Sequence, residues 1–265
     1  MPSIWSNLVA CALVGLTAAQ TPLPLTRSCN VTQIQGCNST GTIRNVDGVD
    51  IYQSIPQSFS NDSTAILFIT DFYGLPSINN RLLADQIASK THRVIMPDLF
   101  NGDAVPMAMA EGPQLNLTEW RARHPTEEID QIIEQTIVYM RSLGITRIGA
   151  VGYCLGGKHV PRFMAAGKGI DLGFIAHPAN LTNDEIQAIS APISIAAGEL
   201  DTLFNKTNRR DAEDILQAKN STYQTNLYSG APHGFAIRPN VAIPVQAYAK
   251  QASFEQAVLW FNTWL

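Results

Sequence analysis

One short stretch of the sequence combines a nucleophilic side chain with the small residues that a sharp turn needs. The hexapeptide Gly-Tyr-Cys-Leu-Gly-Gly at residues 152–157 follows an apolar run at residues 147–151 and precedes a helical pattern. A strand-turn-helix of this kind strains the nucleophile's backbone, so the positions two before and two after it must be small. Gly152 and Gly156 meet that need. The stretch predicts a nucleophile elbow in which Cys154 stands in the place of the more usual serine.

The position of Cys154 directly before a helix bears on its reactivity. The dipole and the free N–H groups of a helix N-terminus favour a thiolate over a thiol. The alternative is a glycine-rich turn around an inert, buried cysteine, and residues 152–157 by themselves leave it open. A decision between the two depends on whether an acid and a base follow at suitable places.

An acid and a base do follow, in the chain order nucleophile, acid, base that α/β-hydrolases use. Asp201 comes after the apolar run 192–197, and His233 comes after the strand-like run 223–228. His233 would accept the thiol proton and later deliver it to the leaving alkoxide, while Asp201 would fix the imidazole tautomer and stabilise the imidazolium. We therefore predict a catalytic triad of Cys154, Asp201 and His233 that works through a thioester acyl-enzyme.

The elements that must position these residues alternate along the chain. Short, continuously apolar runs predict buried strands at 65–70, 93–96, 147–152, 172–176 and 192–197. Helical patterns lie between and after them, at 79–89, 126–143, 156–166, 183–189 and 244–265. No linker or internal repeat divides the chain. The alternation predicts one α/β domain with a mostly parallel, doubly wound sheet.

The last predicted helix carries an apolar stripe. Its members are Phe254, Ala257, Val258, Phe261 and Leu265. Because they recur at helical spacing, we expect this stripe to pack on the sheet.

These motifs together resemble the dienelactone hydrolase (carboxymethylenebutenolidase) family, especially its fungal members. The resemblance covers roughly residues 45–265 and rests on the cysteine elbow, Pro-Asp-Leu-Phe at 97–100, Gly-x-x-Asp ending at Asp201, and His-Gly-Phe-Ala from His233. It implies an α/β-hydrolase fold and cleavage of a small ester or lactone. Cysteine acyl chemistry needs no cofactor, and we expect none.

The resemblance also implies roles for residues around the triad. In that family an acidic residue after an early strand contacts the resting cysteine and helps to activate it, and the next backbone N–H contributes to the oxyanion hole. Asp71 and Phe72 stand at those places, and the amide of Leu155 would be the second oxyanion donor. The family usually carries the longer glutamate, so the alternative is that Asp71 merely ends a strand. Further candidates for the pocket are Tyr73, Tyr153, His177, Phe235 and Arg238.

Substrate charge is the point at which the sequence departs from the family. Bacterial members hold a substrate carboxylate with two arginines, one shortly after the Pro-Asp-Leu strand end and one just after the catalytic histidine. Here residues 101–103 are Asn-Gly-Asp, and Arg238 comes one residue later than the pattern. In an extended segment that shift would turn the side chain to the other face, although a loop could absorb it. We predict a preference for uncharged or larger esters and lactones.

Composition limits the classes of partner. The 265 residues are 45% hydrophobic and 15% charged, with a formal net charge of −4 and no run of Lys or Arg. That balance is typical of a globular chain and gives no basic footprint for nucleic acid or an anionic membrane. His92, His124 and His159 match no metal-ligand spacing, so we expect no metal site. We expect a monomer whose partner is a small-molecule substrate.

The N-terminal segment predicts secretion. An apolar run at residues 8–16 leads into Thr17-Ala18-Ala19, and no charged side chain precedes Arg27. This pattern is typical of a signal peptide covering residues 1–19. A retained anchor is the alternative, but the run is shorter than the roughly 20 residues that span a bilayer. An arm at residues 20–44 would then precede the hydrolase domain at 45–265, and the mature form would be free of the membrane.

Cysteines and sequons fit the same compartment. Cys29 and Cys37 suggest a disulfide in the arm, with two free thiols as the alternative. N-glycosylation sequons begin at Asn30, Asn38, Asn61, Asn116, Asn180, Asn205 and Asn220. We therefore expect a secreted glycoprotein.

Two other functions remain open from the sequence. The same triad would serve a thioesterase or another acyl transfer, and a secreted hydrolase-fold protein can act as a binding module without turnover. The complete set of Cys154, Asp201 and His233 favours catalysis over the binding module.

Overall fold

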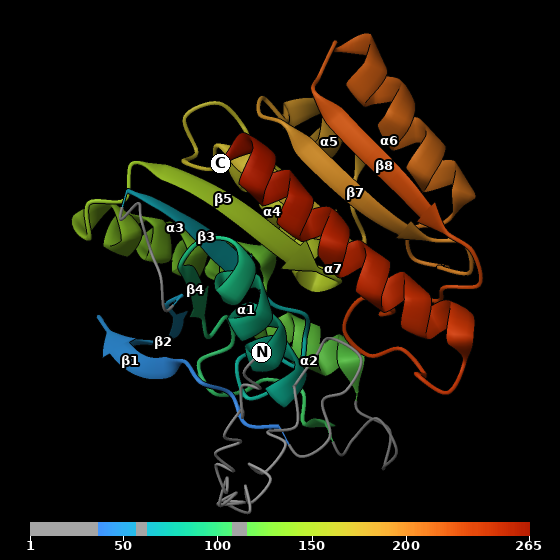
Figure 1. Ribbon diagram of the computed structural model, residues 1–265. Helices are drawn as coiled ribbons and strands as arrows, with labels where there is room; N and C mark the ends of the chain where they lie inside the picture. Colours follow the sequence, from blue (N-terminus) through green and yellow to red (C-terminus); the bar gives the residue numbers. More distant parts are fainter. Residues whose placement is uncertain (1–36, 57–62, 108–115) are drawn as a thin grey trace, which may run out of the picture.

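The computed structural model describes residues 37–56, 63–107 and 116–265 (Figure 1). Within them one eight-stranded sheet has the strand order β1-β2-β4-β3-β5-β6-β7-β8. The strands are β1 Thr42–Val46, β2 Val49–Ser54, β3 Thr64–Ile69, β4 Val94–Pro97, β5 Arg147–Tyr153, β6 Leu172–Ala176, β7 Ile193–Gly198 and β8 Tyr223–Tyr228. The pairs β1–β2 and β2–β4 are antiparallel, and every other neighbouring pair is parallel. The predicted mostly parallel α/β sheet is confirmed.

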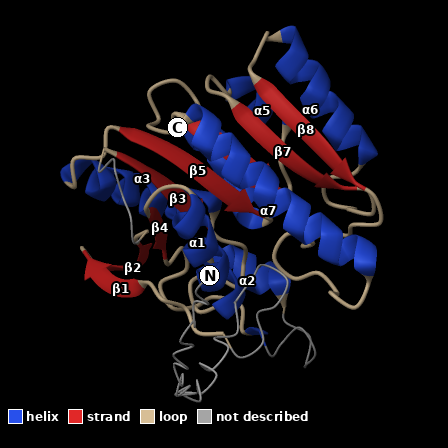
Figure 2. Ribbon diagram, viewed as in Figure 1, coloured by secondary structure: helices blue, strands red, loops and turns tan. Residues whose placement is uncertain are grey.

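Helices cover both faces of the sheet, and each face has its own apolar cluster. One cluster holds α1 (Ile78–Lys90) and α7 (Pro244–Trp264), which Figure 2 shows in front of the strands. The other cluster holds side chains of α2 to α6. Those helices are α2 Leu117–Arg123, α3 Thr126–Ser142, α4 Leu155–Phe163, α5 Asn183–Ala188 and α6 Lys206–Ala218. Strands buried on both faces must be apolar throughout, which is why β3 to β7 are readable as continuous runs.

The predicted strands and helices all form, with ends that differ by a few residues at most. Four elements were not predicted: β1, β2, α2 and α6. β1 is exposed along most of its length and lacks an apolar run, and β2 turns back from it through Asp47 and Gly48, both at positive φ. α6 buries only Ala212 and Leu216, so its sequence shows little of the apolar stripe by which amphipathic helices are recognised.

Two of the five residues predicted to pack on the sheet from α7 are fully buried. Ala257 and Phe261 are buried against the sheet, whereas Phe254, Val258 and Leu265 are half-buried. Gln256 also lies on the buried face, where its Nε2 donates to Ser194 Oγ over 2.8 Å and its Oε1 accepts from Tyr228 over 2.7 Å. A polar side chain that satisfies its hydrogen bonds inside the core is not visible as part of an apolar stripe.

The parallel strands deliver the candidate residues to one edge of the sheet. Asp71, Cys154 and Asp201 follow the carboxyl ends of β3, β5 and β7, and His233 follows β8. Ligand sites of open α/β sheets lie at that edge.

Some sequence-based predictions fall on residues outside the described part of the chain. These are the signal peptide at 1–19, Cys29, Asn30 and Asn61. Among the described residues, no helix combines the length and the apolar character that crossing a bilayer requires.

Candidate active site

The turn between β5 and α4 has the geometry of a nucleophile elbow. Cys154 takes φ 53° and ψ −110°, a strained conformation for a residue with a side chain. A Cβ atom on Gly152 would overlap the backbone of Gly156, and a Cβ on Gly156 would overlap the carbonyl of Ile69 in β3. The structure therefore requires glycine at both positions, for the steric reason that the sequence pattern suggested.

The three predicted triad residues lie in hydrogen-bonding contact. His233 Nε2 is 3.1 Å from Cys154 Sγ, and His233 Nδ1 is 3.0 Å from each carboxylate oxygen of Asp201. Asp201 is buried, and its Oδ1 also accepts from the amides of Leu203 and Phe204. One imidazole thus joins the thiol to a carboxylate that is held from its other side by backbone donors.

The surroundings of Asp201 favour its ionised form. Burial tends to raise the pKa of Asp201, but the hydrogen bond from His233 and the amides of Phe204 and Leu203 outweigh it, so the pKa is lowered. An ionised Asp201 favours a proton on His233 Nδ1, which leaves Nε2 to accept the thiol proton.

Burial disfavours the thiolate form of Cys154. Cys154 is 3% exposed, and burial raises its pKa to about 12, although the Leu155 amide hydrogen bond and the charge of Arg121 on α2 oppose the rise. The helix N-terminus favours the thiolate as expected, but the cost of burying the charge exceeds that benefit. Removal of the thiol proton would therefore need a base, and His233 Nε2 lies within 3.1 Å of the sulfur.

Of the two predicted oxyanion donors, the amide of Leu155 lies beside the nucleophile. The amide N–H of Leu155 donates to the Cys154 sulfur. The carbonyl of Phe72 accepts from Val105 over 2.9 Å, while its own amide N–H has no partner among the described residues. A backbone amide without a partner is suited to the developing charge of a tetrahedral intermediate, and the role of Phe72 and Leu155 as oxyanion donors remains a prediction.

Asp71 is bound elsewhere than at the thiol. Its buried carboxylate accepts from the amide of Tyr73 over 3.1 Å and from Asn80 Nδ2 over 2.9 Å, and it forms an ion pair with Arg238. Among the described residues, no hydrogen bond joins Asp71 to Cys154. Activation of the thiol by Asp71 therefore remains a prediction, and the observed role of this carboxylate is to pair with Arg238.

Arg238 reaches the site despite its shift in sequence. Residues 234–238 form a turn, in which the amides of Ile237 and Arg238 both donate to the carbonyl of Gly234. The premise of an extended segment is wrong, because this turn absorbs the additional residue. The guanidinium lies 4.3 Å from the ring centroid of Tyr73 and beside Asp71, and burial lowers its pKa to about 10.

The other pocket candidates separate into two groups. Tyr73 packs against Phe72 and Arg238, and burial together with the charge of Cys154 raises its pKa. Tyr153, His177 and Phe235 are at most 1% exposed and lie behind the triad in the core. They support the site and do not line an open cavity.

Two polar residues of the site were missed in the sequence. Asn80 of α1 is fully buried and bridges Asp71 to the carbonyl of Gly74. Lys250 of α7 is 4% exposed and donates to the carbonyl of Ile237 over 3.0 Å. Burial lowers the pKa of Lys250 to about 8. A polar residue on the inner face of a predicted helix was the available signal in both cases.

Two other histidines, His124 and His159, pair with carboxylates away from the triad. His124 Nε2 lies 2.9 Å from Asp103 Oδ2, and His159 Nδ1 lies 2.8 Å from Asp130 Oδ1. The described residues contain no group of three or more His, Cys, Asp or Glu side chains that could hold a metal ion.

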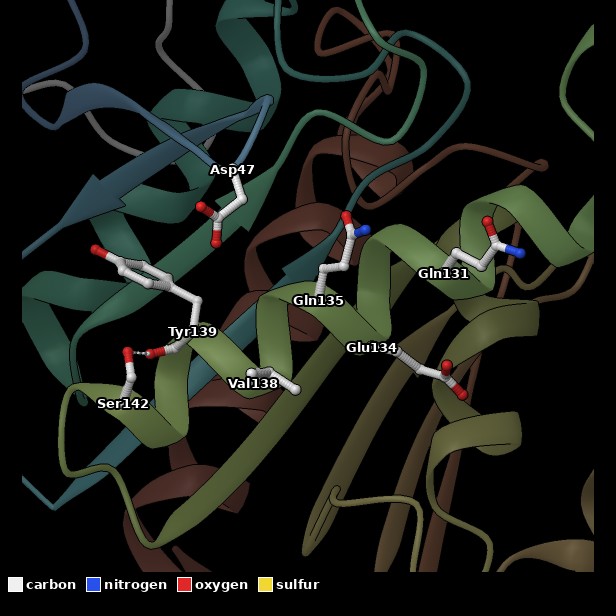
Figure 3. Close-up of a pocket in the computed structure, with 7 residues that line it drawn as sticks. All are labelled: Asp47, Gln131, Glu134, Gln135, Val138, Tyr139 and Ser142. Atoms are coloured by element: carbon white, nitrogen blue, oxygen red, sulfur yellow. Dashed lines mark hydrogen bonds between the residues drawn. The ribbon is translucent and has the colours of Figure 1, made fainter.

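A groove with a volume of about 470 Å³ lies along α3, away from Cys154. Figure 3 shows the residues that line it: Asp47, Gln131, Glu134, Gln135, Val138, Tyr139 and Ser142. Its lining includes none of Cys154, Asp201 and His233 and no nucleophile paired with a base, so the contact of these three residues remains the candidate active site.

Comparison with known proteins places the chain in a family. The family model described as the dienelactone hydrolase family matches residues 49–265. The chain belongs to the dienelactone hydrolase family. As a member of that family, it is a carboxylic ester or lactone hydrolase.

Curated fungal relatives span nearly the same length as this dienelactone hydrolase family member. Hydrolase pyvD of Aspergillus violaceofuscus is 38% identical, over 92% of this chain and 99% of the relative. Hydrolase tropI of Talaromyces stipitatus is 39% identical, over 85% and 91%. A putative dienelactone hydrolase from Klebsiella pneumoniae superposes with a TM-score of 0.70 at 14% identity, over 85% of this chain and 98% of that one. That structure supports the fold.

Proposed function

We propose that this protein hydrolyses a small ester or lactone through an acyl-thioester on Cys154. The observation that carries the proposal is the single imidazole of His233, which contacts the Cys154 sulfur with one nitrogen and the Asp201 carboxylate with the other. A thiol buried at an elbow, a base and an orienting acid are the parts that nucleophilic acyl transfer requires. The backbone donors Phe72 and Leu155 complete the set.

Acylation begins with proton transfer. His233 Nε2 accepts the thiol proton while Cys154 Sγ attacks the carbonyl carbon, and the carbonyl oxygen becomes an oxyanion held by the two amides. The oxyanion then collapses, the C–O bond to the alcohol breaks, and the imidazolium of His233 gives its proton to the leaving alkoxide. A lactone substrate keeps that alcohol on the same molecule. The product of this half is an acyl-thioester and neutral His233.

Deacylation repeats the sequence with water. His233 removes a proton from water, the hydroxide adds to the thioester carbon, and the second oxyanion collapses to a carboxylic acid and the Cys154 thiolate. The imidazolium returns its proton to the sulfur. Because burial raises the pKa of Cys154 to about 12, that return is downhill at neutral pH and restores the resting thiol.

The names of the relatives agree with the reaction class and leave the substrate open. Two relatives from Gibberella moniliformis are named dienlactone hydrolases, and mammalian relatives are named carboxymethylenebutenolidase homologues. Thioesterase activity and other acyl transfers use the same triad, so substrates must decide between them. A hydrolase-fold binding protein without turnover would need none of the contacts of His233.

The test combines a substrate panel with trapping of the intermediate. Purified protein is assayed on enol-lactones, aryl esters and thioesters of matched acyl groups, and quenched reactions are examined by intact-mass spectrometry. We expect turnover of esters or lactones and an acyl adduct on the peptide that contains Cys154. Alkylation by iodoacetamide should be slower than that of a free thiol, because Cys154 is buried and protonated. Turnover without any adduct on Cys154 would contradict the mechanism, and turnover confined to thioesters would assign a thioesterase.

We further propose that the chain is secreted as a glycoprotein with a Cys29–Cys37 disulfide. Five of the seven sequon asparagines lie in the described part of the chain, and all five are exposed: Asn38, Asn116, Asn180, Asn205 and Asn220. Asn116 and Asn205 use their side-chain oxygen to cap α2 and α6, which leaves the nitrogen that carries a glycan free. Exposure of these sites supports glycosylation.

Intact mass of protein secreted from a fungal host tests this proposal. We expect a chain that begins near Gln20, loses mass on treatment with an endoglycosidase, and gains about two mass units on reduction, from one disulfide. A secreted chain that retains Met1, or three free thiols among Cys29, Cys37 and Cys154 before reduction, would contradict it.

A further inference from the structure

A second histidine packs beside the triad. His177 follows β6 and is fully buried, yet neither ring nitrogen has a hydrogen-bond partner within the described residues. Its backbone takes φ 39°, an unusual conformation for a residue with a side chain. A buried polar ring without partners costs free energy of folding that an apolar ring would not. The presence of a histidine at this apolar position therefore needs an explanation in its surroundings.

The ring of His177 packs on the catalytic base. Its centroid is 5.2 Å from that of His233, with an angle of 72° between the planes. Phe235 and Tyr153 hold the same ring at 5.5 and 6.0 Å. The contacts of His177 with His233 and Phe235 are edge-to-face, which at these separations is a favourable arrangement of aromatic rings, and the contact with Tyr153 is tilted. His177 is therefore a fixed surface against which His233 rests.

The segment that carries His177 is bonded to the nucleophile elbow. The amide of Cys154 donates to the carbonyl of Ala176 over 3.2 Å, and the carbonyl of Cys154 accepts from Ala179 over 2.9 Å. The amide of His177 itself donates to Ala196 in β7 over 2.9 Å. These bonds fix the position of His177 relative to both the thiol and the strand that leads to Asp201.

The hydrogen bonds of His233 do not by themselves fix the tilt of its ring, which packing against His177 can restrain. Its two hydrogen bonds, to Cys154 and Asp201, lie at the ends of the ring and set its direction in its own plane. A tilt of that plane is restrained by what packs on the ring. Misplacement of a catalytic group by 1 Å can reduce the rate by about 100-fold.

We propose that His177 is a positioning residue that holds the plane of the His233 imidazole in line with the Cys154 thiol through ring packing. The inference rests on the proposed triad function. The groups that face His177 are His233 and Asp201, together with the rings of Tyr153 and Phe235. Burial lowers the pKa of His177 to about 3, so a neutral ring stands beside His233 when the base becomes an imidazolium.

Three variants test the proposal on the full-length protein with 4-nitrophenyl acetate or the best substrate of the panel. His177→Leu removes the flat ring and keeps much of the volume, and His177→Phe keeps the ring without its nitrogens. Phe174→Leu is the matched control, because Phe174 is fully buried on β6, the strand that leads to His177, and its ring neighbour is Tyr153, not His233. We expect His177→Leu to lower kcat by about 10- to 100-fold with KM within about twofold. His177→Phe should restore kcat to within a fewfold of wild type, and Phe174→Leu should retain it.

Each outcome bears on the proposal. Wild-type kcat in His177→Leu, or a loss in His177→Phe as large as in His177→Leu, would overturn it, because ring packing would then not be the property that matters. An equal loss in Phe174→Leu would also overturn it, since the effect would belong to the core in general. Cys154→Ala, measured in the same assay, distinguishes failure of the proposed triad from failure of the proposed role of His177. Activity in Cys154→Ala would contradict the triad itself. An inactive Cys154→Ala together with fully active His177 variants would contradict only the role of His177.

Discussion

Cys154→Ala is expected to lose hydrolysis by about 1,000-fold or more in kcat. Removing the nucleophile of an acyl-transfer triad leaves the oxyanion donors and the binding surface, which by themselves accelerate the reaction far less than the complete set. The fold should survive, because alanine is smaller and the strained backbone at φ 53° is held by glycine on both sides of the elbow. Steady-state kinetics on the best substrate of the panel, with melting temperature as the check on folding, measure the effect.

Cys154→Ser is the informative companion variant. Serine fits the same space and keeps a hydroxyl near His233 Nε2, but an alcohol gives up its proton less readily than a thiol. We expect activity between that of alanine and that of wild type, without the sulfur adduct seen in quenched wild-type reactions. Undiminished activity in Cys154→Ala would show that another residue is the nucleophile and would remove the triad assignment.

The triad could be predicted from sequence because each of its members is fixed by local rules. The elbow needs glycine on both sides of Cys154, for steric reasons that act within a few residues. Asp201 and His233 follow strands that are recognisable by their apolar runs, and parallel strands bring their carboxyl ends together. Order along the chain and strand ends therefore sufficed to predict that Cys154, Asp201 and His233 lie in contact, without knowledge of any distance.

The surroundings of the triad could not be predicted in the same way. The partner of Asp71 depends on the turn at 234–238, whose hydrogen bonds decide on which side Arg238 emerges. The protonation of Cys154 depends on the balance between burial and a helix N-terminus, and only the three-dimensional packing shows that burial prevails. Contacts of this kind join residues far apart in the chain and leave no local pattern.

Breaking the ion pair between Arg238 and Asp71 is expected to have a large effect on the stability of the fold. Arg238→Met should reduce the free energy of unfolding by about 3 to 5 kcal/mol, because it leaves the fully buried Asp71 carboxylate without its compensating charge. Asp71→Asn combined with Arg238→Met should recover most of that loss, since no buried charge then remains. Urea unfolding measures both. Lys168→Met is the matched control: its ion pair with Glu134 is more than half exposed and should change stability by about 1 kcal/mol or less.

The same double variant tests substrate charge without the complication of an unstable fold. Because Asp71 already neutralises Arg238, a substrate carboxylate would have to displace an existing partner, and we expect wild type to show no strong preference for a carboxylated lactone over its methyl ester in kcat/KM. A free charge-assisted contact would be worth roughly 1.5 to 3 kcal/mol, or about 10- to 100-fold in affinity. A preference of that size in wild type that disappears in the double variant would show that Arg238 leaves Asp71 to bind the substrate, and the predicted preference for uncharged esters would then be wrong.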